Sequence, residues 1–302
     1  MNIFLTGGSG FIGSTLTQRM TSSGHKVTLL TRSIKKGRTL PEGASFLEAN
    51  PMNPGPWQEK VAENEVIINL AGASIFTRWN KKTKRNILES RILTTNHIVE
   101  ALQERKSKET HLINASAVGY YGFHGDEILD ETGAQGNDFL ASVAKEWESA
   151  ALTAQKFGVR VVLCRFGIVL GKHGGTLSKM VPAFKHNLGS PFGSGKQWFS
   201  WIHEQDLADI ILFFLEQKGL EGPANCTAPN PVRNRELTKI LGQVLQKRRI
   251  FPSVPGFVLK LMLGEFGNII LKGQRVIPQK LLDNGFSFKF PFLKEALQDL
   301  LI

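Results

Sequence analysis

Short apolar runs alternate with longer amphipathic stretches along the first half of the chain. The short runs are rich in Val, Ile, Leu and Phe, as buried strands are, and the longer stretches carry apolar residues three and four positions apart, as helices do. The expected strands are 2–6, 26–31, 45–48, 65–71, 111–116 and 159–165, and the expected helices are 11–23, 80–105 and 137–157. This alternation predicts an α/β fold, a doubly wound parallel Rossmann sheet with helices on both faces.

The alternation loosens after residue 165. Glycine-rich stretches at 167–175 and 189–195 precede a strand-like run at 199–203, a helix at 205–216 and a short strand at 224–227. We expect a Rossmann dinucleotide-binding domain over 1–228, in which 171–198 reaches toward the substrate side. We expect 229–302 to form a small, mostly helical C-terminal lobe that caps the substrate and docks on the sheet.

The first predicted strand runs directly into a glycine turn. Gly7, Gly10 and Gly13 give the spacing G-x-x-G-x-x-G, and Gly8 with the last two gives G-x-G-x-x-G. Glycine permits the tight turn and lets a pyrophosphate approach the backbone, and the following helix points its positive end at the phosphates. The motif predicts dinucleotide binding, and the alternative is a glycine turn that only packs helix on strand.

The end of the second predicted strand distinguishes the two nicotinamide cofactors. NAD sites carry an acid there for the ribose hydroxyls, whereas NADP sites carry a base for the 2′-phosphate. Here the strand ends in Thr31-Arg32-Ser33, followed by Lys35 and Lys36, with no acid. An arginine can hold a phosphate with two hydrogen bonds, so NADP is the expected cofactor. The alternative is that Arg32 is an ordinary surface residue and the selectivity is loose.

The formal net charge of +11 favours anionic partners. The bases form local clusters at 35–36, 81–85 and 247–249. These clusters lack the interleaved aromatic residues of an RNA-binding sheet. We therefore expect a solvated basic surface that attracts a phosphorylated cofactor and substrate, and no nucleic-acid partner.

Compartment and metal content follow from what the sequence lacks. No signal peptide precedes the first strand, and the apolar segments 207–215 and 254–271 are too short or too interrupted by charges to span a bilayer, so we expect no membrane partner. Cys164 and Cys226 follow no disulfide or metal spacing, which predicts buried free thiols in the cytoplasm. The seven histidines do not lie at metal-ligand spacing, so no metal site is expected.

Several stretches go beyond a general Rossmann sequence. Residues 6–13, 69–72 and 201–207, with Ser116 and Arg165, resemble the extended short-chain dehydrogenase/reductases, which include nucleotide-sugar epimerases. Residues 78–80, 90–92, 116–122, 189–195 and 273–279 are similar to the YfcH-like group called "epimerase family protein". The resemblance covers essentially the whole chain.

The resemblance implies a cofactor site made of residues from several strand ends. The implied pyrophosphate contacts are Gly7, Gly10, Phe11 and Ile12, and the adenosine phosphate contacts are Thr31 and Arg32. The implied adenine and ribose side is Leu70, Ala71 and Gly72, with Arg91 reaching a phosphate or ribose and Val169 approaching the nicotinamide.

The superfamily performs hydride chemistry with a Ser or Thr and a Tyr-x-x-x-Lys pair, in which the lysine lowers the tyrosine pKa. Lys145 is present here, but Ala141 stands where the tyrosine belongs. The nearest substitutes are Tyr120 and Tyr121, in the loop after Ser116. These two tyrosines, Ser116 and Lys145 are the candidate catalytic residues. The alternatives are loop packing for the tyrosines and an ordinary helix lysine for Lys145.

Two functions remain open from the sequence. One is an NADP-dependent oxidoreductase or epimerase acting on a small substrate, either free or linked to a nucleotide. The other is a non-catalytic NADP-binding redox sensor or scaffold, which Ala141 permits. His203 and Asp206 resemble an acid–base pair, but we expect them to cap the helix that starts near Glu204. The resemblance also implies a homodimer formed through the helices 80–105 and 137–157.

Overall fold

The computed structural model describes residues 1–34, 39–107, 109–247 and 252–302, so the basic clusters at 35–36 and 248–249 lie outside the described residues. A seven-stranded parallel sheet forms its centre, in the order β12-β7-β5-β4-β1-β2-β3. The strands are β1 (Asn2–Thr6), β2 (Lys26–Thr31), β3 (Ala44–Glu48), β4 (Val66–Asn69), β5 (His111–Ala117), β7 (Arg160–Phe166) and β12 (Gly222–Cys226). This sheet confirms the predicted doubly wound α/β fold.

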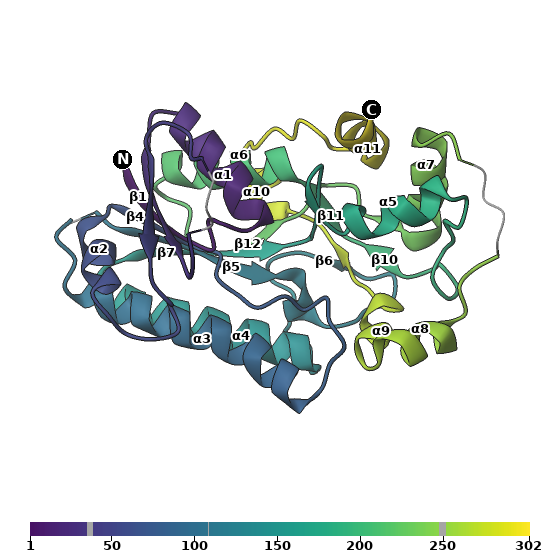
Figure 1. Cartoon of the computed structure of the whole chain (residues 1–302), viewed down its shortest axis with the longest axis horizontal. Helices are drawn as coiled ribbons and strands as arrows, with labels where there is room; N and C mark the ends of the chain where they lie inside the picture. The colour runs from purple at the N-terminus through teal and green to yellow at the C-terminus, as the bar shows by residue number, and fades with distance from the viewer. Residues whose placement is uncertain (35–38, 108, 248–251) are drawn as a thin grey trace.

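Helices cover both faces of the sheet (Figure 1). The helices α1 (Phe11–Ser22) and α6 (Glu204–Glu216) pack on one face, and α2 (Trp57–Glu63), α3 (Lys81–Gln103) and α4 (Phe139–Leu152) pack on the other. Their apolar stripes supply the core: Leu16 and Met20 from α1 are fully buried, as are Ile98 and Leu102 from α3. The 3.6-residue periodicity therefore places each helix as expected.

Two elements end earlier than predicted. β4 ends at Asn69, because the next residues leave the sheet beside the glycine turn. α4 ends at Leu152 and continues as the 3₁₀ helix η2 (Thr153–Phe157), which Gly158 terminates in a left-handed conformation.

The expected strand at 199–203 is two short strands. β10 (Trp198–Phe199) pairs with β13 (Val232–Arg233), and β11 (Trp201–His203) pairs with β8 (Ile168–Gly171). Ser200 separates them, because its hydroxyl donates to the Gln274 carbonyl and accepts from the Val276 amide. Ser200, which is bound to the C-terminal segment, thus marks the point where pairing with β13 ends and pairing with β8 begins.

The remaining elements lie on the substrate side and in the tail. They are η1 (Val118–Tyr121), β6 (Ile128–Leu129), β9 (Gly174–Gly175), α5 (Leu177–Lys185), α7 (Asn234–Val244), α8 (Gly256–Leu263), α9 (Phe266–Ile270), β14 (Arg275–Val276), α10 (Gln279–Asp283) and α11 (Leu293–Leu301). Leu297 and Leu300 of α11 belong to the same continuous apolar core as Ile3 of β1. The boundary after residue 228 stays a prediction. Within the described ranges, we find no helix with the length and apolar character to cross a bilayer.

Candidate functional site

The glycine turn joins β1 to α1 and is closed to side chains. Gly7 has φ of 71°, and a Cβ there would lie 2.9 Å from the carbonyl carbon and oxygen of Leu70. A Cβ on Gly13 would lie 2.4 Å from the Gly7 carbonyl oxygen. The Gly10 amide donates to that same oxygen at 2.9 Å, and no described side chain caps α1. The positive end of α1 is therefore a ready position for a phosphate group.

Phe11 and Val169 meet through a glycine hairpin. A Cβ on Gly171 would lie 2.3 Å from the Phe11 ring, and a Cβ on Gly175 would lie 2.7 Å from the Val169 carbonyl oxygen. The Val169 side chain is in the core, so only its backbone can approach a ligand. Ile12 is half-buried and packs against the same core. The hairpin of β8 and β9 thus joins the start of α1 to the strand that leads toward the substrate side.

The end of β2 carries the residues predicted to choose the cofactor. The Thr31 hydroxyl donates to the Ser33 carbonyl at 3.1 Å and lies 3.4 Å from the Ser9 hydroxyl of the glycine turn. Arg32 is exposed, and none of the ion pairs among the described residues includes it. The structure therefore places an exposed cation, without an ion-pair partner among the described residues, at the strand end whose Thr31 hydroxyl lies near the glycine turn. Lys35 and Lys36, predicted to support it, lie outside the described residues.

The end of β4 approaches Arg91 of α3. A Cβ on Gly72 would lie 2.9 Å from the Arg91 Cζ atom, and the guanidinium donates to the carbonyls of Ala73 at 3.2 Å and Ile87 at 2.8 Å. Burial lowers the pKa of Arg91 to about 10, which keeps it charged at neutral pH. Among the described residues, no carboxylate pairs with this cation. It is thus suited to hold an anionic or hydroxyl-rich ligand.

The main chain at the end of β4 lies against the glycine turn. A Cβ on Gly7 would meet the carbonyl of Leu70, and the Ala71 amide lies 3.3 Å from the Thr6 hydroxyl oxygen, which accepts its hydrogen bond. The structure therefore brings together Gly7, Leu70 and Ala71, and Gly72 lies beside Arg91.

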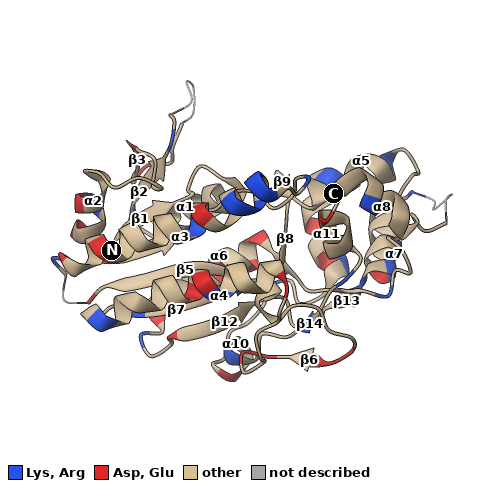
Figure 2. Cartoon of the chain, turned by 90° about the horizontal axis from the view of Figure 1, so that it is seen from below, with Lys and Arg blue, Asp and Glu red and all other residues tan. Residues whose placement is uncertain are grey.

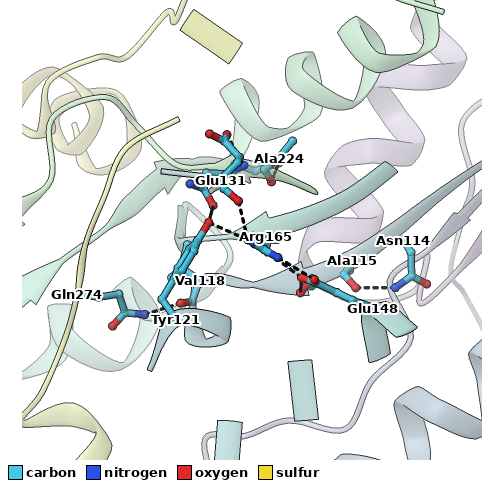
Figure 3. A network of polar contacts seen from close by, with 12 residues as sticks. Asn114, Ala115, Val118, Tyr121, Glu131, Glu148, Arg165, Ala224 and Gln274 are labelled. Carbon is cyan, nitrogen blue, oxygen red and sulfur yellow. Dashed lines mark hydrogen bonds and ion pairs between the residues drawn. The ribbon is translucent and has the colours of Figure 1, made fainter. Parts of the chain in front are cut away.

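Ser116 belongs to a buried polar network. Figure 3 shows its members Glu148, Arg165 and Tyr121. Its hydroxyl donates to Glu148 Oε1 at 2.6 Å, and Arg165 donates to both oxygens of the same carboxylate at 2.9 Å. All three side chains are buried. Burial alone would lower the pKa of Arg165, but the hydrogen bonds and charge of Glu148 raise it above its ordinary value. The Ser116 hydroxyl therefore already donates its proton to a buried carboxylate of the protein.

The two tyrosines differ in access. The Tyr121 side chain is fully buried, where its hydroxyl donates to Asn225 at 2.7 Å and accepts from Arg165 at 2.9 Å. Burial raises the pKa of Tyr121 to about 12, so it is neutral at physiological pH. Tyr120 is half-buried, with the Arg165 Cζ atom 3.6 Å from its ring centre, and its hydroxyl forms no hydrogen bond with a described residue. Tyr120 is thus the tyrosine that a ligand can reach.

Lys145 lies at the exposed margin of the α4 face that carries this network, four residues after Ala141 and three before Glu148. The buried face of the helix carries Ala141, Ala144 and Glu148, whereas Lys145 is exposed and forms no ion pair with a described residue. The structure brings Ser116, Tyr120 and Tyr121 together around Arg165 and leaves Lys145 outside that group. Its catalytic role stays a prediction.

The expected capping of α6 is confirmed for His203, whereas Asp206 binds the tail instead. His203 Nδ1 accepts from the Gln205 amide at 3.1 Å and caps α6, and the Asp206 carboxylate accepts from the amides of Lys289 at 2.8 Å and Phe290 at 3.0 Å. These bonds fasten the segment before α11 to the start of α6. Cys164 and Cys226 are buried and free, as predicted. Across the described parts of the chain, no group of His, Cys, Asp and Glu residues is arranged to hold a metal ion.

Sequence reasoning missed two features of the site. Glu148 went unnoticed, although a carboxylate seven residues after Ala141 lies on the apolar stripe of a helix and so signals a buried ion pair. The second feature is a buried amide network at adjacent strand ends, in which Asn69 accepts from Thr6 at 2.6 Å and donates to Asn114 at 2.7 Å. Polar residues at the ends of successive apolar strands are the signal that could have found it.

Comparisons with known proteins match the chain along its length. The NAD dependent epimerase/dehydratase family matches residues 3–225, and a domain of unknown function (DUF1731) matches residues 254–300. The Epimerase family protein SDR39U1 homolog, chloroplastic, of Arabidopsis thaliana is 41% identical over 99% of this chain and 86% of its own length. The Epimerase family protein YfhF of Bacillus subtilis is 40% identical over 100% of this chain and 98% of its own. A crystal structure of human epimerase family protein SDR39U1 (isoform 2) with NADPH has 31% identity and a TM-score of 0.86, covering 99% of both chains.

Proposed function

The chain belongs to the NAD dependent epimerase/dehydratase family, and from this premise we propose that it is an NADP(H)-dependent oxidoreductase or epimerase. Its substrate is a small molecule, either free or linked to a nucleotide. The observation that carries the proposal is Arg32, an exposed cation without an acidic partner among the described residues, at the strand end that selects the cofactor. The similar human protein crystallised with NADPH supports the same cofactor.

The residues of the glycine turn fit this cofactor. Gly7 and Gly13 leave no room for a side chain, so the backbone and the start of α1 would hold the pyrophosphate. Arg32, with the hydroxyls of Thr31 and Ser9, would hold the 2′-phosphate. The bound cofactor would supply a hydride at its nicotinamide ring.

Tyr120 is the residue we propose to exchange a proton with the substrate. Its accessible ring and unbound hydroxyl support this role, whereas Tyr121 is fully buried and Ser116 is bound to Glu148. The Arg165 guanidinium against the Tyr120 ring would stabilise negative charge that develops on the phenol. Arg165 acts here as a positioning residue, because Glu148 already neutralises much of its charge.

A non-catalytic NADP(H)-binding protein is the second candidate, and α4 supports it. The buried face of this helix offers Ala141 and Ala144 in place of a proton-exchanging pair, and Lys145 is exposed. In that case the protein would bind NADP(H) as a redox sensor or scaffold and show no turnover. Either version fits a cytoplasmic protein, since both cysteines are buried free thiols.

Calorimetry with NADPH and NADH tests the cofactor. We expect NADPH to bind more tightly than NADH, and Arg32→Glu to weaken NADPH by roughly a hundredfold, because it removes a charge-assisted contact and adds repulsion. The matched control is Lys26→Glu, which makes the same charge change at the opposite end of β2. If the wild-type protein does not bind NADPH, the proposed function is wrong, and if Arg32→Glu binds NADPH as tightly as Lys26→Glu does, the 2′-phosphate contact is wrong.

A metabolite screen separates the two candidates. Pooled aldehydes, ketones and nucleotide-linked sugars would be added with NADPH, and the corresponding alcohols with NADP, while absorbance reports the nicotinamide. Turnover that Tyr120→Phe lowers and Tyr121→Phe preserves would support the oxidoreductase. Tight NADPH binding favours the sensor if no pool changes the absorbance and if chromatography of the nucleotide-linked sugars detects no new epimer, because an epimerase returns the hydride and leaves the absorbance unchanged.

A further inference from the structure

The helix α8 presents large apolar side chains to solvent. Phe257, Leu261 and Met262 are 72%, 77% and 67% exposed, whereas Leu259 on the other side of the helix is buried next to α9. Single exposed apolar residues are common on protein surfaces, but three within six positions of one short helix form a patch. Such a patch is typical of a surface that binds another protein or a membrane.

Basic residues surround this patch. α8 contains Lys260 and no acid (Figure 2), and the nearby Glu265 is neutralised by Lys84 of α3 at 2.6 Å. Arg78 lies next to Gly264, at the end of α8. Figure 1 places the first turn of α3 beside α9, where Lys81 and Lys82 are exposed. Arg78, Lys81, Lys82 and Lys260 form no ion pair with any acid in the described part of the chain.

The basic residues at the start of α3 do not stabilise this helix. A helix N-terminus carries partial positive charge and favours acids in its first turn. The first turn of α3 contains Lys81 and Lys82 and no acid. Their positive charges oppose the helix dipole, so an external anion explains their position better than helix stability does.

We propose that this face docks on an anionic membrane surface. The docking surface consists of Phe257, Leu261 and Met262, flanked by Arg78, Lys81 and Lys82. The apolar side chains would enter the boundary between headgroups and acyl chains, and the cations would contact the lipid phosphates. The helix would lie on the membrane without crossing it. We thereby replace the expectation of no membrane partner, which rested on the lack of a membrane-spanning segment.

A second copy of the chain fits this face less well. A symmetric contact would join two copies of a surface whose cations have no ion-pair partner among the described residues, within molecules that each carry a net charge of +11. An anionic bilayer complements both features of the surface, because it offers apolar depth and negative charge together.

Co-sedimentation with vesicles tests the proposal. Wild-type protein should bind vesicles of phosphatidylcholine with phosphatidylglycerol and bind vesicles of phosphatidylcholine alone much more weakly. The double variant Phe257→Ser/Leu261→Ser should bind the anionic vesicles roughly a hundredfold more weakly, since two large apolar side chains no longer insert. Lys81→Gln/Lys82→Gln should weaken binding by roughly tenfold or more on anionic vesicles.

The matched control is Phe292→Ser, which removes an apolar side chain that is 56% exposed outside the docking surface. It should bind vesicles as the wild type does, and circular dichroism and NADPH binding should show that every variant is folded. Equal binding of the wild type and Phe257→Ser/Leu261→Ser would overturn the proposal, as would equal wild-type binding to neutral and anionic vesicles. A wild-type dimer that the same double variant makes monomeric would overturn it in favour of a second copy.

Discussion

At the ends of β2 and β4, Arg32 and Arg91 lie without an acidic partner among the described residues, whereas at the end of β7 Arg165 is surrounded by partners. Arg165 donates to the Glu148 carboxylate, the Tyr121 hydroxyl and the Glu131 carbonyl, and Tyr121 in turn binds Asn225. The arginines of the first region can therefore bind an anionic ligand. In the second region the arginine is already paired with groups of the protein.

This difference has a physical basis. A buried cation is costly unless carboxylates and hydrogen bonds compensate it, so a satisfied network contributes to the structure and is expensive to break. A partly exposed cation beside a glycine turn has no carboxylate partner in the protein, so it can form a charge-assisted hydrogen bond with a bound anion. We therefore expect the cofactor to bind in the open region. In the closed region, Tyr120 is the one predicted catalytic side chain with a hydroxyl that no described residue binds.

Breaking the buried ion pair should have the largest effect. Glu148→Ala leaves Arg165 buried without its carboxylate and should lower the free energy of unfolding by about 3–5 kcal/mol. Chemical denaturation followed by circular dichroism measures it. Ser116→Ala removes one hydrogen bond to the same carboxylate and should cost only about 1 kcal/mol. Similar losses for the two variants would contradict the central place of the ion pair.

Acid should loosen the link between α6 and the tail. Burial lowers the pKa of His203 to about 4, against the raising effect of Asp299, whereas the unfolded chain titrates near 6.5. The unfolded state therefore binds a proton that the folded state does not, and stability present above pH 6.5 is lost as the pH falls toward 4. This loss amounts to about 3 kcal/mol.

The control for His203 is His203→Asn, which keeps a side-chain oxygen to cap α6 but does not titrate. Denaturation between pH 4 and 7 should show a flatter dependence for this variant than for the wild type. Parallel curves would show that another group causes the pH dependence.

In the open region, Arg91→Gln should weaken NADPH binding without a matching loss of stability. The loss of a charged contact predicts about 2 kcal/mol, or roughly thirtyfold in Kd by calorimetry. Arg91→Lys should restore part of it, since the positive charge returns without the planar guanidinium. If Arg91→Gln lowers the free energy of unfolding as much as Glu148→Ala does, Arg91 stabilises the fold and the ligand-binding role is wrong.

The smallest effect separates the tyrosines. Tyr121→Phe leaves Arg165 and Asn225 each short of one buried partner and should cost about 1–1.5 kcal/mol of stability. Tyr120→Phe should leave the free energy of unfolding nearly unchanged, because its hydroxyl binds no described residue. Thermal denaturation of the two variants side by side measures the difference, and equal costs would contradict the assignment of Tyr120 to the accessible side.

The C-terminal segment connects to the closed region. Gln274 donates to the Val118 carbonyl at 2.8 Å, the Gly273 carbonyl accepts from the His124 amide at 3.3 Å, and a Cβ on Gly273 would lie 2.1 Å from the Trp198 carbonyl oxygen. The loop that carries Tyr120 thus contacts residues that lie about 150 positions later in the chain. Part of the region that matches a domain of unknown function is therefore required to shape this loop.

The succession of strands and helices along the first half of the chain, the glycine turn and the cation at the end of β2 could all be predicted from the sequence, because they depend on short-range patterns. Alternating apolar runs specify a parallel sheet, glycine spacing specifies the turn, and strand ends in such a sheet share one edge. Even the capping role of His203 followed from its position before an amphipathic helix.

The roles of the polar residues beyond that edge were decided by tertiary structure. Ser116 could bind a substrate or a neighbouring helix, and only the packing of α4 on β5 brings Glu148 within 2.6 Å of it. Tyr120 and Tyr121 are adjacent in sequence, yet burial makes one a structural group and leaves the other accessible. A local pattern determines which backbone conformation forms. Contacts between distant segments determine whether a polar group is already satisfied, and therefore whether it remains able to bind a ligand.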